Sequence, residues 1–168
     1  MKMFHRIVLM LLVLVSCVGC DQATKQLVRA RLPESVTYSF FGDVFRLQHM
    51  QNHGAFLSLG DTLSGPARFA VFTLAVGAAL AAMVVYLVRK RDIAAVDVVA
   101  FSLIAGGGIG NLVDRILYAG GVTDFLNLGI GPVRTGIFNV ADIAIMLGAG
   151  MLLVRGLRAE KTGTGQGA

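Results

Sequence analysis

The sequence VTDFLNLGIGPVRTGIFNVADIAI, residues 122–145, places one aspartate on each side of a segment rich in glycine and proline. Asp142 precedes an apolar run that reaches Val154 without another charge, which predicts a membrane-spanning helix. Because a carboxylate that enters a bilayer segment is costly, Asp142 is a candidate functional residue. The segment between the two aspartates allows the chain to double back and bring Asp124 close, through Gly129, Gly131, Pro132 and Gly136.

The composition around this stretch is that of a membrane protein. Of the 168 residues, 55% are hydrophobic and 15% are charged, and the mean hydropathy is +0.72. Soluble domains carry about 25% charged residues. The net charge of +5 does not indicate a nucleic-acid partner, because the basic residues fall mainly at the ends of apolar runs, as membrane topology requires.

Four apolar runs predict an all-α membrane protein with four transmembrane helices in one domain, residues 1–168. The spans are expected at about 7–25, 67–88, 93–113 and 138–154, followed by a disordered tail at 159–168. The third span ends in Gly106, Gly107, Gly108 and Gly110, and such small residues let helices approach closely.

The region between the first two spans, residues 26–66, is polar and predicts a small extracytoplasmic β structure with a short surface helix. Residues 36–40 and 45–48 alternate with the period of two that is typical of strands. Gly42 and Asp43 between them suit a turn.

Basic residues set the expected orientation. They are dense in the short segments that four spans place on one side, namely the N-terminus, residues 89–92 and the C-terminal tail. Both termini should therefore be cytoplasmic. Six polar residues then lie at the outer end of the bundle or beyond it: Asp21, Asn52, Asn111, Asp114, Asp124 and Asp142.

This convergence indicates a site. Two carboxylates close together cannot easily both ionise, and the sequence places no spare cation to neutralise both Asp124 and Asp142. One carboxylate can then take a proton from water while the protonated one donates a hydrogen bond to a substrate carbonyl, as in aspartic peptidases. The alternative is that the polar groups only hold helices together, with Asp114 and Arg115 as an ion pair.

Other chemistries fit less well. His49 and His53 have the spacing of a zinc-peptidase helix, but Met50 stands where that motif needs glutamate, so no metal is expected. A small transporter with Asp142 as an ion site remains an alternative, although its carboxylates should lie near mid-membrane. A further alternative is a lipoprotein anchored through Cys20, because Val18-Gly19-Cys20 looks like the end of a lipobox.

Five motifs, in order, resemble the bacterial lipoprotein signal peptidase family (signal peptidase II). They are Asp21-Gln22-Ala23-Thr24-Lys25, Asn52-His53-Gly54-Ala55, the block Gly106 to Arg115 with Asn111 and Asp114, Val122-Thr123-Asp124-Phe125, and Phe138-Asn139-Val140-Ala141-Asp142. The second departs from the family pattern, because Phe56-Leu57 follows where Ala-Phe is common.

The resemblance implies an aspartic endopeptidase of the bacterial inner membrane that removes signal peptides from diacylglyceryl-modified prolipoproteins, without a cofactor, and that acts as a monomer among membrane lipids. It implies that Asp124 and Asp142 are catalytic and that the surface β structure holds the substrate. The implied site-lining residues are Asn52, Gly54, Asn111, Arg115 and Asn139, and the implied supporting residues are Asp21, Lys25 and Asp114.

Overall fold

The computed structural model describes residues 1–53, 63–90 and 92–163, with side chains up to residue 158. Its helical elements are α1 (Met3–Arg31), α2 (Gly65–Phe69), the π-helix η2 (Ala70–Ala75), α3 (Val76–Arg89), α4 (Ala95–Leu117) and α5 (Val140–Gly163). Its strands are β1 (Thr37–Phe40), β2 (Phe45–Asn52), β3 (Val122–Ile130) and β4 (Val133–Arg134).

Among the described residues, four helical segments are long and apolar enough to cross a membrane, which confirms the four runs predicted from the sequence: Met3–Arg31, Gly65–Arg89, Ala95–Leu117 and Val140–Arg158. The second combines α2, η2 and α3. The first runs past Lys25, where the sequence suggested its end, so the six residues up to Arg31 also belong to the helix.

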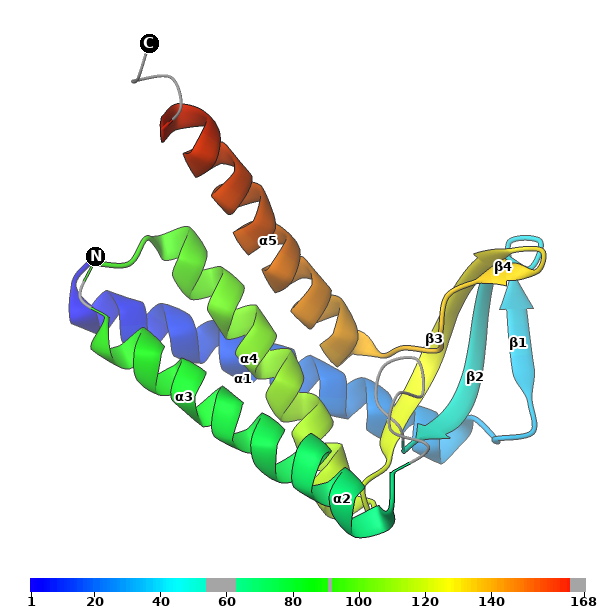
Figure 1. Ribbon diagram of the computed structural model, residues 1–168. Coiled ribbons are helices and arrows are strands. Elements are labelled where there is room, and N and C mark those ends of the chain that lie inside the picture. The colour runs from blue at the N-terminus through cyan, green and yellow to red at the C-terminus, as the bar shows by residue number, and fades with distance from the viewer. Residues whose placement is uncertain (54–62, 91, 164–168) are drawn as a thin grey trace.

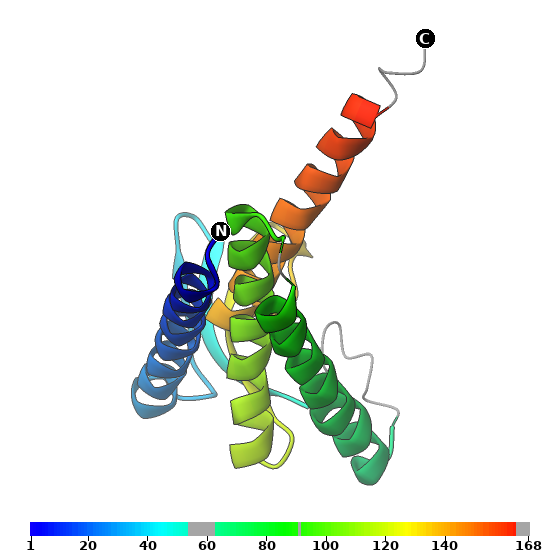
Figure 2. The same ribbon diagram turned by 90° about the vertical axis from the view of Figure 1, so that its left-hand side faces the viewer.

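Helix α4 occupies the middle of the bundle, in contact with α1, α3 and α5 (Figures 1 and 2). Its glycines permit this. A Cβ atom on Gly106 would come within 2.8 Å of Cys17 in α1, one on Gly107 within 2.3 Å of the Ala141 carbonyl oxygen, and one on Gly108 within 2.6 Å of Leu80 in α3. Successive glycines thus admit three different helices, as small residues do in membrane bundles.

Gly107 offers a direct test of this packing. We expect Gly107→Ala to destabilise the fold by about 1–3 kcal/mol, because the new methyl group would overlap backbone rather than a side chain that can rotate away. Thermal unfolding in detergent measures the effect. Gly19→Ala is the matched control, since a Cβ there has no neighbour within 4 Å. Equal melting temperatures for the two variants would contradict the packing.

The β structure is a four-stranded antiparallel sheet in the order β1-β2-β3-β4. The predicted β1–β2 hairpin is confirmed, with Gly42 and Asp43 at positive φ in its turn. The short surface helix stays a prediction: α2 runs without a break into η2, and residues 54–62 are outside the described part of the chain.

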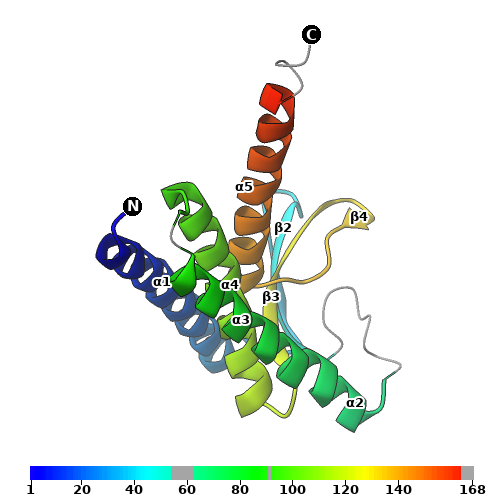
Figure 3. The ribbon, with the colours of Figure 1, turned by 60° about the vertical axis from the view of Figure 1, so that its left-hand side comes forward.

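Strand β3 adds to the sequence interpretation, which expected only that the segment between Asp124 and Asp142 doubles back. The chain does double back there, at Gly131 and Pro132, but as a β3–β4 hairpin. The pairing of β2 with β3 shifts by one residue between Leu47 and Met50, which leaves Met50 opposite Asp124. An isolated bridge between Leu126 and Phe138 brings β3 next to the residues that lead into α5 (Figure 3).

Candidate active site

Asp142 lies in the first turn of α5 and is held there by Asn139, the residue before the helix. The Asn139 backbone N–H donates to Asp142 Oδ2 at 3.1 Å, and the Asp142 N–H donates to Asn139 Oδ1 at 3.0 Å. This is a reciprocal capping box. It fixes the carboxylate at the positive end of the helix dipole, a position that suits a negative charge.

Asp124 approaches the same point from β3 and is 3% exposed. Its Oδ1 accepts a hydrogen bond from Asn139 Nδ2 at 2.6 Å, and its Oδ2 accepts one from Asn52 Nδ2 at 2.9 Å. Burial raises the pKa of Asp124 to about 6; the hydrogen bond from Asn52 opposes this rise, and the charge of Asp142 adds to it. Asp124 therefore holds its proton more readily than an exposed aspartate.

Two asparagines join the carboxylates. Asn139 Nδ2 also donates to Asn111 Oδ1 at 3.0 Å, and Asn111 Nδ2 donates to Asp142 Oδ1 at 2.9 Å. Asn139 is fully buried and Asn111 is 9% exposed. Asn52, Asn111 and Asn139 therefore surround the two aspartates with amide groups.

Lys25 is fully buried and contacts the asparagine bridge between the two aspartates. Its Nζ lies 2.8 Å from Asp21 Oδ2 and 3.5 Å from Asp114 Oδ2, and it donates to Asn111 Oδ1 at 2.8 Å. Asp21 Oδ1 in turn accepts the Ala141 backbone N–H at 3.0 Å. Asp21 and Lys25 thus connect α1 to the asparagine bridge and to the start of α5.

Asp114 does not form the ion pair with Arg115 that the sequence left open. Its carboxylate pairs with Lys25 and, at 3.1 Å, with Arg29, and it accepts the Thr123 backbone N–H at 2.9 Å. It therefore anchors the start of β3, one residue before Asp124, to the end of α4.

Two residues of this network were given no role in the sequence analysis. Gln22 Nε2 donates to Asp114 Oδ1 at 3.1 Å, to the Gly110 carbonyl oxygen at 3.0 Å and to Asp21 Oδ2 at 3.2 Å. Arg29, besides pairing with Asp114, lies 4.2 Å from the centre of the Tyr118 ring. The four-residue spacing of Asp21, Lys25 and Arg29 could have found the arginine, since such residues share a helix face.

Arg115 acts on both aspartates through its charge, without a direct ion pair to either among the described residues. The positive charge of its half-buried side chain interacts with Asp124 and with Asp142. Its guanidinium lies 5.8 Å from the centre of the Phe72 ring and lines a small cavity of about 90 Å³ with His53 and Arg68. Gly54, expected beside them, is outside the described residues.

The described residues contain no group of three or more His, Cys, Asp or Glu side chains that could hold a metal ion. His49 points elsewhere, with its Nδ1 3.1 Å from the Leu32 carbonyl oxygen. The site contains two carboxylates that accept hydrogen bonds from asparagine side chains, with the charge of Arg115 nearby. Such a pair of carboxylates is suited to proton transfer.

Comparison with known proteins identifies the family of this chain. The family model for signal peptidase (SPase) II matches residues 13–158. The chain belongs to the signal peptidase II family. A lipoprotein signal peptidase of Nitratidesulfovibrio vulgaris is 39% identical over 150 residues, covering 89% of this chain and 88% of the relative. One from Halothermothrix orenii is 33% identical over 143 residues, covering 85% and 91%.

A solved bacterial membrane enzyme shares the fold of this signal peptidase with a TM-score of 0.80 and 25% identity, covering 91% of this chain and 90% of that one. The peptidase is therefore a multi-pass membrane protease. The all-α membrane fold with a small β structure is confirmed. The transporter and the Cys20-anchored lipoprotein are not favoured, and Cys20 lies inside the continuous helix α1.

Proposed function

We propose that Asp124 and Asp142 are the catalytic pair with which this peptidase cleaves diacylglyceryl-modified prolipoproteins just before the lipidated cysteine. The observation that carries the proposal is the double role of Asn139. Its side chain donates to Asp124, and its backbone N–H caps Asp142, so that one residue sets the position of both carboxylates. The relatives named lipoprotein signal peptidase support the substrate class.

In the proposed reaction Asp142 is ionised and accepts a proton from a water molecule as its oxygen attacks the scissile carbonyl carbon. Asp124 enters protonated and donates its proton to the carbonyl oxygen. Breakdown of the resulting diol returns a proton to Asp124 and passes the other from Asp142 to the departing amine. The raised pKa of Asp124 and the helix-capping position of Asp142 support this division of roles, although a close pair titrates as a unit.

The surroundings of the pair suit a substrate that arrives from the membrane. Asn52 and Arg115, from the sheet and from α4, would contact the substrate, and the sheet would hold it. The dense basic residues at the N-terminus, at positions 89–91 and in the last turns of α5 favour an inner-membrane orientation with both termini cytoplasmic and the aspartates on the extracytoplasmic side.

The lipid on the substrate provides the decisive test. Two synthetic prolipoprotein peptides would be compared, identical except for the diacylglyceryl group on the cysteine. We expect the purified peptidase to cleave the modified peptide before the cysteine and to leave the unmodified one intact, as product masses would show. Equal cleavage of both, or cleavage elsewhere, would contradict the proposed substrate.

The pH profile tests the role of Asp124. Because its pKa is about 6, the free enzyme loses the catalytic proton as the pH rises through that value. We expect kcat/KM to fall along a limb centred near pH 6, with no compensating gain above it. Asn52→Ala removes a hydrogen bond that favours the ionised form, so the limb should move to higher pH.

Gln48→Ala on the same strand is the control for this shift, because its side chain contacts Thr37 rather than the site. A limb that stays in place in Asn52→Ala, or that moves equally in both variants, would show that Asp124 is not the titrating group.

A further inference from the structure

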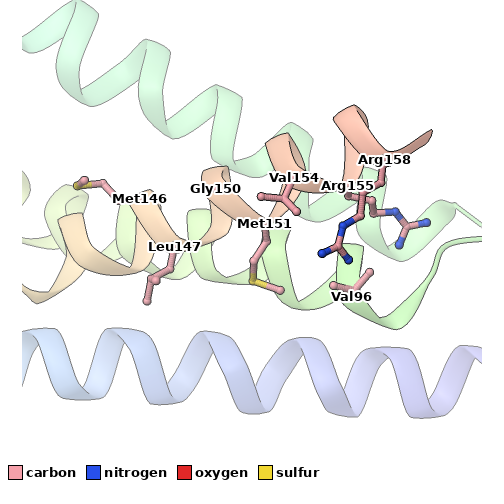
Figure 4. A pocket seen from close by; sticks show the side chains of 8 residues that line it. All are labelled: Val96, Met146, Leu147, Gly150, Met151, Val154, Arg155 and Arg158. Atoms are coloured by element: carbon pink, nitrogen blue, oxygen red, sulfur yellow. The ribbon is translucent and has the colours of Figure 1, made fainter. Parts of the chain in front are cut away.

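A groove lies along the half of α5 that is farthest from the aspartates (Figure 4). It has a volume of about 580 Å³ and is lined by apolar side chains that include Leu147, Met151 and Val154 of α5 and Val96 of α4. Arg155 and Arg158 lie at one end. The groove is open rather than an enclosed cavity.

The groove forms because α5 leans away from the rest of the bundle (Figure 1). At Gly148, α5 touches α4, since a Cβ there would come within 2.5 Å of the Ala100 carbonyl oxygen. Beside this contact the lining side chains stay open: Leu147 is 58% exposed, Val154 48% and Val96 43%. A Cβ on Gly150, which lines the groove, would meet nothing within 4 Å.

The length of the groove matches one leaflet of a bilayer. From Met146 to Arg158 the helix rises about 18 Å. Half of the hydrocarbon core measures about 15 Å. An acyl chain that follows the groove would therefore run from the bilayer interior to the headgroup level, where the two arginines lie.

The charge at that level selects among possible occupants. Arg155 is 45% exposed and binds Asp97 through its Nε at 3.1 Å, which offsets its charge, and Arg158 beside it leaves this end of the groove with a net positive charge. The signal peptide of a substrate carries a basic n-region, which these arginines would repel. A phosphate group fits them, because arginine donates to phosphate with paired, charge-assisted hydrogen bonds.

We propose that this groove binds an anionic phospholipid, with an acyl chain along α5 and the phosphate at Arg155 and Arg158. The assignment of this lipid to the cytoplasmic leaflet rests on the proposed orientation. The lipid would cover apolar side chains on the half of α5 that packs least against the bundle, and so would hold the helix whose first turn positions Asp142.

The absence of tryptophan from the sequence provides a clean assay. Met146→Trp places a single fluorophore on the groove wall. Its quenching in vesicles that contain brominated phosphatidylglycerol or brominated phosphatidylcholine gives the relative binding constant of the two lipids. We expect phosphatidylglycerol to bind roughly fivefold more tightly, as one net positive charge near an anionic headgroup would produce, because Asp97 offsets the charge of Arg155. A reporter outside the groove, Leu153→Trp, should show no such preference.

Variants in the Met146→Trp background separate the contribution of the lipid headgroup from that of the acyl chain. Arg155→Gln with Arg158→Gln should abolish the preference for phosphatidylglycerol, and Gly150→Leu should reduce quenching by both lipids by filling the groove. Arg89→Gln and Gly156→Leu are the matched controls, since neither residue lines the groove and Gly156 also has open space around its Cβ position. Both should behave as the parent.

No preference in the parent, an unaltered Gly150→Leu variant, or an equal loss in Arg89→Gln would overturn the proposal, the last by showing that general surface charge attracts the lipid. The assay measures neither cleavage nor orientation. A negative result would therefore count against the lipid site alone. The proposed peptidase function is tested separately, by the comparison of lipidated and unlipidated peptides.

Discussion

Replacing either Asp124 or Asp142 with asparagine will abolish cleavage of a lipid-modified prolipoprotein peptide, with a fall in kcat of roughly 10³-fold or more. Asparagine can neither accept the proton of the attacking water nor donate one to the substrate carbonyl, so each variant lacks half of the proposed proton transfer. Initial rates with a fluorogenic lipidated peptide in detergent measure the loss. Undiminished cleavage by either variant would exclude the pair as the catalytic groups.

The fold should survive both substitutions, which makes the result interpretable. At position 142 an amide oxygen can still accept a hydrogen bond from Asn139 or Asn111. At position 124 one of the two donors, Asn52 or Asn139, would face an amide NH₂ group, and this loss is offset because no charge is then buried. Thermal unfolding should confirm that both variants are folded. Asp92 is exposed at the opposite end of the bundle, so the Asp92→Asn variant should cleave the peptide normally.

The membrane helices could be predicted because each consists of an apolar run bounded by charge, and a bilayer leaves such a run few alternatives. Strand β3 could not. Its first four residues, Val122 to Phe125, are all buried, so the strand lacks the alternation by which half-exposed strands are recognised. The adjacent glycines and proline then favoured a loop. The β-forming residues Val122, Thr123 and Phe125 ahead of the Gly131-Pro132 turn were the available signal.

Partner choice within the site was also beyond the sequence. Asp114 and Arg115 are neighbours in the chain, yet Asp114 pairs with Lys25 and Arg29 of α1, whereas the charge of Arg115 acts on the two aspartates. Adjacent residues on a helix point about 100° apart, so they do not face each other. Spacing identified the shared faces, Asn111 with Asp114 and Asn139 with Asp142, but the rotation of each helix about its axis determines which face meets which.

The largest effect on stability is expected at Lys25. Lys25→Met leaves Asp21 and Asp114, both fully buried, without their shared cation. Breaking a buried ion pair from one side costs about 3–5 kcal/mol, because the remaining charge is neither hydrated nor neutralised. Arg29 still pairs with Asp114, so the uncompensated charge falls mainly on Asp21. Thermal unfolding in detergent should therefore show a strongly lowered melting temperature for Lys25→Met.

A double variant separates lost charge balance from lost packing. Adding Asp21→Asn to Lys25→Met removes the uncompensated carboxylate while keeping an oxygen that can accept the Ala141 N–H, so it should recover much of the lost stability. Arg31→Met, exposed at the end of α1, should have little effect. Cleavage in the double variant should remain low, because Lys25 also donates to Asn111, which in turn donates to Asp142. If the double variant is less stable than Lys25→Met, the cluster is held by its packing and hydrogen bonds rather than by the neutralisation of Asp21.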